Sequence, residues 1–328
     1  MGFAKSRRLM GLDISATSVK LLEISGSAGK RSVEHYAVVG LPPGSVVEKQ
    51  IADPEAVGEA IAKVLRKSGT RTKKAVIAVG GSSTITKYIT LPAGLTERQQ
   101  EQQIEVEAEQ HIPFPIEEVS IDFQIVGPQP NDPDSVDVLL AAARSDHVDS
   151  SVAALEMGGL EAVIVDLEVF ALESACGLLQ HQIAIEADAG EKSTAKNAAK
   201  KRDQSLPGQS VAVVDVGAST TSLTVLVDGR PVYTRDQLFG GQQLTDEIMQ
   251  RYELSFADAG RMKKEGGLPE GYEADVLRPF MRDMSQQVNR AIQLYQSASS
   301  QDAGMAQIIL AGGCASIKDI DRVVQAET

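Results

Sequence analysis

The 328-residue sequence predicts an α/β protein with two lobes, each built on a mixed sheet flanked by helices. Three observations support this prediction. Strand-like and helix-like segments alternate along the chain, a polar stretch over residues 187–209 interrupts them, and one strand–turn–strand pattern occurs on both sides of it. We therefore expect a first lobe over residues 1–186, a flexible linker over 187–209 and a second lobe over 210–328.

Charge, hydropathy and cysteine usage narrow the function classes. A formal net charge of -13 without a dense basic patch argues against nucleic acid as a partner. No apolar run approaches the roughly 20 residues that a membrane-spanning helix needs. Cys176 and Cys314 stand far apart without metal-ligand spacing, which is typical of a protein from a reducing compartment. We expect a soluble, cytoplasmic protein.

The first half shows punctuated helices between strands. Strand-like segments around residues 10–24 come first, and a helix should begin at Pro54 behind the cap Asp53. The strand "AVIAVGG" and the segment "ITKYITLP" follow. A second helix, "TERQQEQQIEVEAEQHI", opens on a capping box formed by Thr96 and Gln99. Two strands, a helix over about 146–157, the strand "AVIVD" and a further helix complete this half.

The second half repeats the alternation after the polar stretch 187–209. That stretch has almost no apolar residue larger than alanine, so it cannot bury enough surface to offset its chain entropy. The strand "VAVVDVG", a strand pair to about residue 236, helices over 243–298, the strand "IILAGG" and a last helix near Ser316 follow. The sequence thus predicts two similar α/β halves.

An internal repeat points to the chemistry. Alignment of "LDISATSVKLL" with "VDVGASTTSLT" places Asp13 on Asp215 and Ser18 on Thr220. Each copy reads as a hairpin whose turn of small and hydroxyl residues can direct backbone N–H groups at an anion. Two facing hairpins would grip a phosphate chain, and their aspartates would then repel unless a divalent cation lay between them. Either hairpin alone could also be an ordinary turn, because these residue types favour turns.

A third motif fits the same ligand. In "IILAGGCASI", Gly312 and Gly313 follow a buried strand and precede a helix. Two glycines there would let the sugar and α-phosphate of a nucleotide lie against bare backbone beside a helix N-terminus. Signatures of other enzymes, including G-x-x-x-x-G-K-[ST] and G-x-S-x-G, are missing from the sequence.

These three motifs, in this order, resemble the phosphate-1, phosphate-2 and adenosine motifs of the actin and Hsp70 ATPase superfamily. Within it the chain resembles the PilM family of type IV pilus assembly proteins. The segments "GLDISATSVKLLEI", "EAEQHIPFPIEEVSIDFQIV", "VAVVDVGASTTSLTVL", "YTRDQLFGGQQLTDEI", "KKEGGLP" and "IILAGGCASI" carry the resemblance from about residue 10 to the end. The block "HIPFPIEEV" is the most specific of them, because the nucleotide motifs occur throughout the superfamily.

The resemblance implies an actin-like ATPase fold with ATP and Mg²⁺ as ligands, and a small α/β subdomain inserted over about residues 91–162. Where the superfamily places E-x-x-K beside the base, this chain has Gly260 and Lys263, so half of that contact is missing. Asp13 and Asp215 would hold Mg²⁺ largely through water. The expected nucleotide-binding residues are Asp13, Ser15, Thr17, Ser18, Lys20, Asp215, Gly217, Ala218, Ser219, Thr220, Gly240, Gly241, Lys263, Gly312 and Gly313.

The resemblance also implies a role. PilM-like proteins dock the cytoplasmic tail of the membrane protein PilN, so we expect a nucleotide-dependent scaffold recruited to the inner face of the inner membrane with other inner-membrane pilus assembly proteins. Since no water-positioning residue is recognisable, we expect ATP binding with at most slow hydrolysis. Self-association stays open. The alternatives are a filament-forming division scaffold like FtsA and an ATP-hydrolysing enzyme of the Hsp70 and sugar kinase superfamily.

Overall fold

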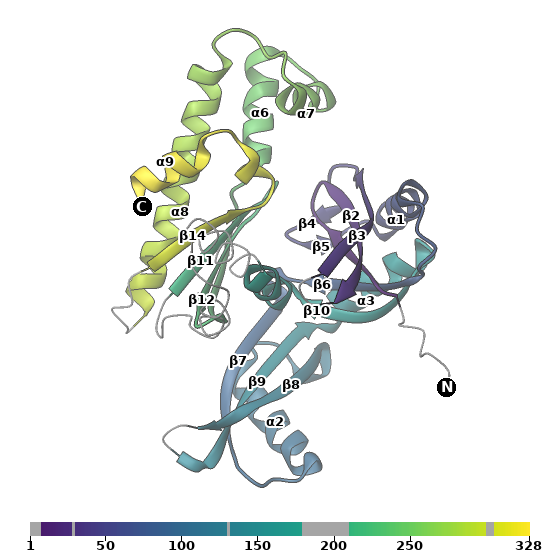
Figure 1. The fold of residues 1–328 in the computed structure, drawn as a ribbon, viewed down its shortest axis with the longest axis vertical. Helices are drawn as coiled ribbons and strands as arrows, with labels where there is room; N and C mark the ends of the chain where they lie inside the picture. The colour runs from purple at the N-terminus through teal and green to yellow at the C-terminus, as the bar shows by residue number, and fades with distance from the viewer. Residues whose placement is uncertain (1–7, 28–29, 130–131, 179–209, 300–304) are drawn as a thin grey trace, which may run out of the picture. The chain divides into compact units, whose positions relative to one another are not determined.

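A computed structural model describes residues 8–27, 30–129, 132–178, 210–299 and 305–328 (Figure 1). The chain divides into two compact units, Met1–Glu168 and Val169–Thr328. The expected linker 187–209 lies outside the described residues, so the predicted division into lobes 1–186 and 210–328 stays a prediction. Each unit is described separately below.

The first unit is built on a five-stranded sheet. Its order is β10-β6-β1-β2-β3, and the strands span Glu161–Leu167, Lys74–Val79, Met10–Ile14, Ser18–Ser27 and Lys30–Gly40. β10, β6 and β1 run parallel, while β1, β2 and β3 form an antiparallel meander. The carboxyl ends of the three parallel strands therefore share one edge of the sheet. In an open α/β sheet this is the edge where ligands bind.

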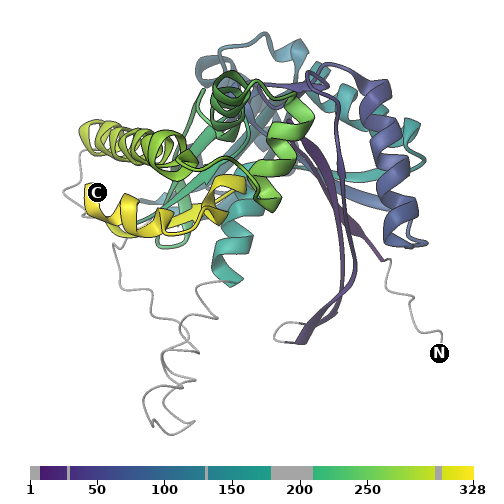
Figure 2. The same ribbon diagram turned by 90° about the horizontal axis from the view of Figure 1, so that it is seen from above.

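Two helices cover one face of this sheet. α1 (Pro54–Ser68) follows the short strands β4 (Val46–Val47) and β5 (Gln50–Ile51), and Figure 2 shows it running beside the sheet. Its predicted cap is confirmed, because the carboxylate of Asp53 accepts a bond from the N–H of Ala56 at 3.0 Å. α3 (Ser145–Met157) packs against α1, and the shared core is Leu21, Ile61, Val64 and Leu155 with their buried neighbours.

A second, smaller sheet is inserted between β6 and α3. Its order is β7-β9-β8, and the strands span Thr84–Pro92, Asp132–Arg144 and Val119–Gln129. α2 (Glu97–His111) packs on it through Ile104 and Ala108. The Thr96–Gln99 capping box is confirmed. We call residues 84–144 the insert. The predicted range 91–162 also took in α3 and β10, which the structure places with the five-stranded sheet because their apolar residues bury against α1 and β6.

The block "HIPFPIEEV" joins α2 to β8 inside the insert. Ile112 is buried in the core of the insert, and Phe114 and Ile116 pack against that core. The guanidinium of Arg144 lies over the ring of Phe114, 5.7 Å from its centroid. A short 3-10 turn, η2 (Ile116–Glu118), then leads into β8. The block is thus an apolar connection that closes the insert around its own core.

The second unit repeats the strand arrangement of the first. Its sheet has the order β13-β12-β11-β14, with strands Arg230–Gln237, Thr221–Val227, Ser210–Val216 and Met305–Ala311. β11, β12 and β13 form an antiparallel meander, and β14 pairs parallel with β11. This is the arrangement of β1, β2, β3 and β6. The repeat seen in the sequence therefore extends to the sheets.

Helices cover both faces of the second sheet. α6 (Gly241–Tyr252), α7 (Phe256–Glu265), α8 (Arg278–Ala298) and α9 (Ile320–Glu327) share the larger core, which includes Val214, Ile248 and Met284. Residues 168–178 are helical, and Cys176 packs with Val213 and Leu226 in a separate cluster. Among the described helices, none is long and apolar enough to cross a membrane.

Candidate functional site

The hairpin of β1 and β2 forms the first predicted phosphate-binding turn. The N–H of Ser15 donates to the carbonyl of Ser18 at 2.9 Å, and the Ser15 hydroxyl donates to the same oxygen at 3.0 Å. Asp13 stands opposite Lys20 in the strand pair, and the two exposed side chains form an ion pair. Thr17 accepts a bond from the N–H of Leu41. The lysine expected at the phosphates thus contacts the aspartate expected at the metal.

The hairpin of β11 and β12 forms the second turn with the same hydrogen bond. The N–H of Gly217 donates to the carbonyl of Thr220 at 3.0 Å, so Gly217 and Thr220 occupy the places of Ser15 and Ser18. Asp215 lies opposite Ser222, as Asp13 lies opposite Lys20. The two turns that the sequence aligned are therefore alike in backbone geometry. Because they belong to different units, the approach of Asp13 to Asp215 stays a prediction.

The N-terminus of α6 is docked on the second turn. The N–H of Gly241 donates to the carbonyl of Gly217 at 3.0 Å, and the N–H of Gln242 donates to Ala218 at 2.8 Å. A Cβ built on Gly240 would overlap the backbone of Ala218, so only glycine permits this approach. Gly217, Ala218, Gly240 and Gly241, all predicted site residues, lie together in the second unit.

Lys263 of α7 reaches the same place from the other side. Its ammonium donates to the carbonyl of Gly241 at 2.8 Å and to the hydroxyl of Thr245. Burial lowers the pKa of Lys263 from its ordinary value. The thiol of Cys314 lies 3.7 Å from the carbonyl of Gly217, and burial raises the pKa of that thiol, an effect that Lys263 opposes. A cation is thus held at the helix start where a nucleotide is expected.

Gly312 closes the second turn at the end of β14. Its φ of 82° lies in the left-handed region, and a Cβ there would overlap both the carboxylate of Asp215 and the backbone of Val216. The backbone beside the aspartate is therefore bare, and the predicted contact of Gly312 and Gly313 with a nucleoside stays a prediction. The helix predicted near Ser316 starts later, at Ile320, after the 3-10 turn η5 (Gly313–Ser316).

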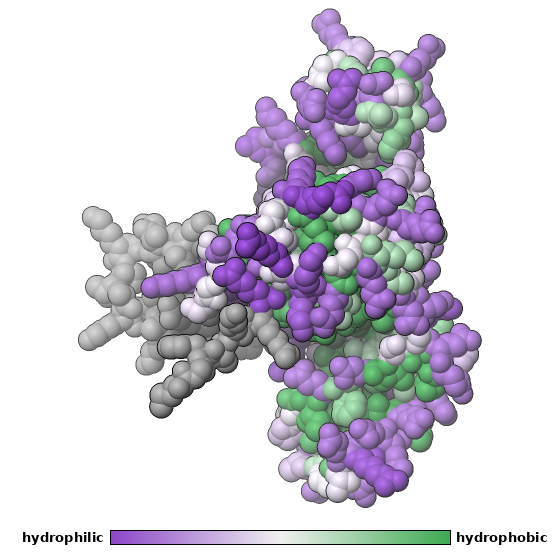
Figure 3. Space-filling view, turned by 90° about the vertical axis from the view of Figure 1, so that its right-hand side faces the viewer, coloured by the Kyte–Doolittle hydropathy of each residue, from purple (hydrophilic) through white to green (hydrophobic). Residues whose placement is uncertain are grey.

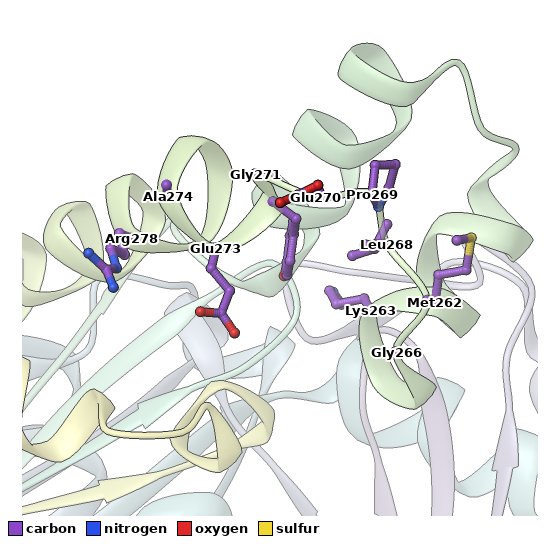
Figure 4. A pocket seen from close by; sticks show the side chains of 12 residues that line it. Met262, Lys263, Gly266, Leu268, Pro269, Glu270, Gly271, Glu273, Ala274 and Arg278 are labelled. Carbon is purple, nitrogen blue, oxygen red and sulfur yellow. The ribbon is translucent and has the colours of Figure 1, made fainter.

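A pocket of about 560 Å³ opens next to Lys263 (Figure 4). Its size lies within the range of small-molecule sites. Figure 4 shows Glu270 and Glu273 on one side of it and Lys263 with Met262 on the other. Sequence reasoning missed Glu270, Tyr272, Glu273 and Arg278, although the glycines of "KKEGGLP" preceding them were a visible signal. This chain has Gly260 where the superfamily has a glutamate. The carboxylates of Glu270 and Glu273 are the acidic groups that line the pocket.

The first unit carries a glycine pair that sequence reasoning also missed. Gly80 and Gly81 follow β6 as Gly312 and Gly313 follow β14, and in each pair the second glycine begins a 3-10 turn, η1 (Gly81–Ser83) or η5. A Cβ on Gly80 would overlap the carboxylate of Glu168, which pairs with the ammonium of Lys49 at 2.6 Å. The likeness of "AVIAVGG" to "IILAGG" was the available signal.

Comparison with known structures first defines the class of protein. The structure matches a PilM-PilN type IV pilus biogenesis complex with a TM-score of 0.72 and 27% identity, covering 98% of this chain and 85% of that one. It also matches the ethanolamine utilization protein EutJ from Carboxydothermus hydrogenoformans with a TM-score of 0.54 and 15% identity, covering 97% and 81%. The repeated mixed sheet flanked by helices is that of the actin-like ATPase fold, as the sequence predicted.

The family model of the type IV pilus assembly protein PilM matches residues 11–328. The chain therefore belongs to the PilM family, and it is an actin-like protein of type IV pilus assembly. The resemblance drawn from the sequence motifs is confirmed.

Proposed function

We propose that this protein binds ATP with Mg²⁺ and acts as a nucleotide-dependent scaffold in pilus assembly. The enclosed turn of the second unit carries the proposal. There, Gly240 and Gly312 leave backbone bare around Asp215, and Lys263 places an ammonium beside them. Bare backbone, a carboxylate and a cation suit a polyphosphate with a divalent metal.

The residues of both turns fit the proposed ligands. Asp13 and Asp215 would hold Mg²⁺ largely through water, as a small cation that keeps its hydration shell prefers. The small and hydroxyl residues of each turn would meet phosphate oxygens, and the pocket beside Lys263 has room for the nucleoside. Among the described residues, no group of three or more His, Cys, Asp or Glu gathers to hold a metal by itself. The phosphates would therefore complete the coordination.

Titration of the purified protein with ATP and Mg²⁺ tests this proposal. Asp215→Ala should weaken Mg²⁺-dependent binding about tenfold or more, since one of two metal-facing carboxylates is lost. Glu247→Ala is the matched control, because it removes an exposed carboxylate of α6 about 9 Å along the helix from Gly241. Equal affinity in both variants would contradict the assignment. Phosphate release should stay slow throughout.

We also propose that the insert takes part in docking the cytoplasmic tail of PilN. The PilM-PilN complex that the structure resembles supports the choice of partner. Apolar side chains are exposed on the insert, including Tyr88, Val106 and Ile125. Figure 3 shows apolar groups at the surface in the lower third of the view. A short tail that becomes ordered on such a surface would hold a cytoplasmic protein at the inner face of a membrane.

The insert can be removed more cleanly than the predicted 91–162 segment. Ser83 and His147, which flank the insert, lie 2.6 Å apart through their side chains, so a short glycine linker can replace residues 85–143. We expect a synthetic PilN tail to bind the full chain at micromolar strength and the excised chain at least tenfold more weakly. Unchanged binding by a folded excised chain would move the docking site elsewhere. Retained Mg²⁺-ATP binding is the control for folding.

A further inference from the structure

A two-residue turn in the first unit has an unusual backbone. Glu48 and Lys49 join β4 to β5, and their φ angles are 49° and 67°. Both lie in the left-handed region that favours glycine, asparagine and aspartate, and neither residue is one of these. A strained conformation of this kind persists only where surrounding contacts hold it.

Contacts of Lys49 with His147 and Glu168 hold this turn. The carbonyl of Lys49 accepts a bond from Nε2 of His147 at 3.1 Å. The ammonium of Lys49 pairs with the carboxylate of Glu168 at 2.6 Å. Gly81 gives the turn room, because a Cβ there would lie 3.3 Å from the carbonyl of Glu48. The turn therefore places the Lys49 side chain beside Gly81, with its ammonium on Glu168.

His147 is itself held in one tautomer. A carbonyl can only accept, so Nε2 must carry the proton that is donated to Lys49. Nδ1 is then the acceptor for the hydroxyl of Ser83, 2.6 Å away. Ser83 immediately precedes β7, and His147 lies in the first turn of α3. The imidazole thus joins α3, which follows the insert, to Ser83, which precedes it, and to the strained turn.

The contacts end at the edge of the sheet where the proposed phosphates would lie. Glu168 follows β10, Gly80 follows β6 and Ser15 follows β1, so all three lie past the carboxyl ends of adjacent parallel strands. A carboxylate at this edge would repel a polyphosphate unless it is paired and held in place. Lys49 pairs it, and His147 holds Lys49.

We propose that His147 is a positioning residue for the nucleotide site, acting through the Glu48–Lys49 turn to fix the Lys49–Glu168 ion pair over Gly80. The effect of His147 on ATP binding rests on the proposed function, that this protein binds ATP with Mg²⁺. Its effect on the turn does not depend on ATP. The alternative is that His147 only ties the two ends of the insert together through Ser83.

Two substitutions separate these roles. His147→Gln keeps an N–H near the position of Nε2, so the bond to the Lys49 carbonyl is retained while the Ser83 bond is lost. His147→Asn keeps an oxygen near the position of Nδ1, so the Ser83 bond is retained while the Lys49 bond is lost. If His147 is a positioning residue, His147→Asn should release Lys49 and weaken ATP binding, while His147→Gln should keep both near their wild-type values. A role as a tie between the ends of the insert predicts the reverse.

The rate of Lys49 acetylation in the intact protein, followed by mass spectrometry without nucleotide, measures how firmly the turn holds the Lys49 ammonium. We expect His147→Asn to raise the rate severalfold over wild type, because the ammonium is no longer held against Glu168, and His147→Gln to stay near wild type. In titrations with ATP and Mg²⁺, His147→Asn should weaken binding about fivefold, at the low end of site-to-site coupling. Lys49→Met should do the same, and adding His147→Asn to it should cause no further loss.

Equal Lys49 acetylation in wild type and His147→Asn would overturn the inference. The inference would also be overturned if Lys49 acetylation rose and ATP affinity fell in His147→Gln but not in His147→Asn. If wild type bound no ATP while Lys49 acetylation rose only in His147→Asn, the proposed function would fail and the positioning of the turn would stand. If His147→Asn did not fold, unchanged ATP affinity in Lys49→Met would still refute the effect on the nucleotide site.

Discussion

The two aspartate turns share a backbone and differ in their surroundings. The turn that follows Asp13 lies in the open, and its aspartate pairs with Lys20, whose side chain is also exposed. The turn that follows Asp215 is enclosed by the start of α6, by the half-buried Lys263 and by Gly312. The same local pattern therefore produced one exposed and one enclosed turn. The difference shows that the short-range sequence determines the conformation of the turn. The segments packed around the turn determine how much unfolding free energy a substitution there removes.

Gly312 should be the most sensitive position of the enclosed turn. Gly312→Ala combines a left-handed backbone with a Cβ that overlaps Asp215 and Val216, so we expect a loss of about 3 kcal/mol or more in unfolding free energy. Gly313→Ala is the matched control, because no atom lies within 4 Å of its added Cβ. Urea unfolding of both variants measures the contrast. Similar midpoints would show that the enclosure is looser than described.

Lys263 should rank second. Lys263→Met removes a half-buried ammonium that donates to Gly241 and Thr245, which leaves a carbonyl without that donor and should cost about 1–3 kcal/mol. Part of this loss is offset because Met has no charge to desolvate, whereas partial burial disfavours the charged ammonium and lowers the pKa of Lys263. Urea unfolding at pH 7.5 measures the net change. A stabilised variant would mean that desolvation of the ammonium outweighs its hydrogen bonds.

His147 should make the stability of the first unit depend on pH. Burial lowers its pKa below 6.5, against the opposing pull of Asp146. The unfolded chain therefore binds the proton first as pH falls below 6.5, so stability should fall with acid from there down to the folded-state pKa. We expect the unfolding free energy to be lower at pH 5 than at pH 7. Urea unfolding at both pH values checks this, and His147→Gln should flatten the difference.

The exposed Asp13–Lys20 pair should matter least to stability. Lys20→Met should change the unfolding free energy by less than about 1 kcal/mol, because exposed ion pairs contribute little. The effect should shrink further in 0.5 M salt, where the charges are screened. A loss as large as that of Lys263→Met would show that the first turn is as enclosed as the second. The same variant can be titrated with ATP and Mg²⁺ to test its predicted phosphate contact.

Much of the fold followed from short-range patterns. Asp53 with Pro54 and Thr96 with Gln99 set the starts of α1 and α2 as predicted, since caps satisfy backbone groups within one turn. The boundaries of the insert were harder to predict from the sequence. α3 and β10 have the same kind of apolar pattern as the insert, and only their packing against α1 and β6 assigns them to the larger sheet.

The sequence by itself determined the two aspartate turns, their order and the family, because the residues that make them are neighbours in the chain. The tertiary structure alone decided that Gly240 abuts Ala218, that Lys263 donates to the carbonyl of Gly241, and that Glu168 lies over Gly80. These contacts join residues that are 22 to 88 positions apart. Local secondary-structure propensity does not predict such contacts, because they form only when strand order and helix packing bring separate segments together.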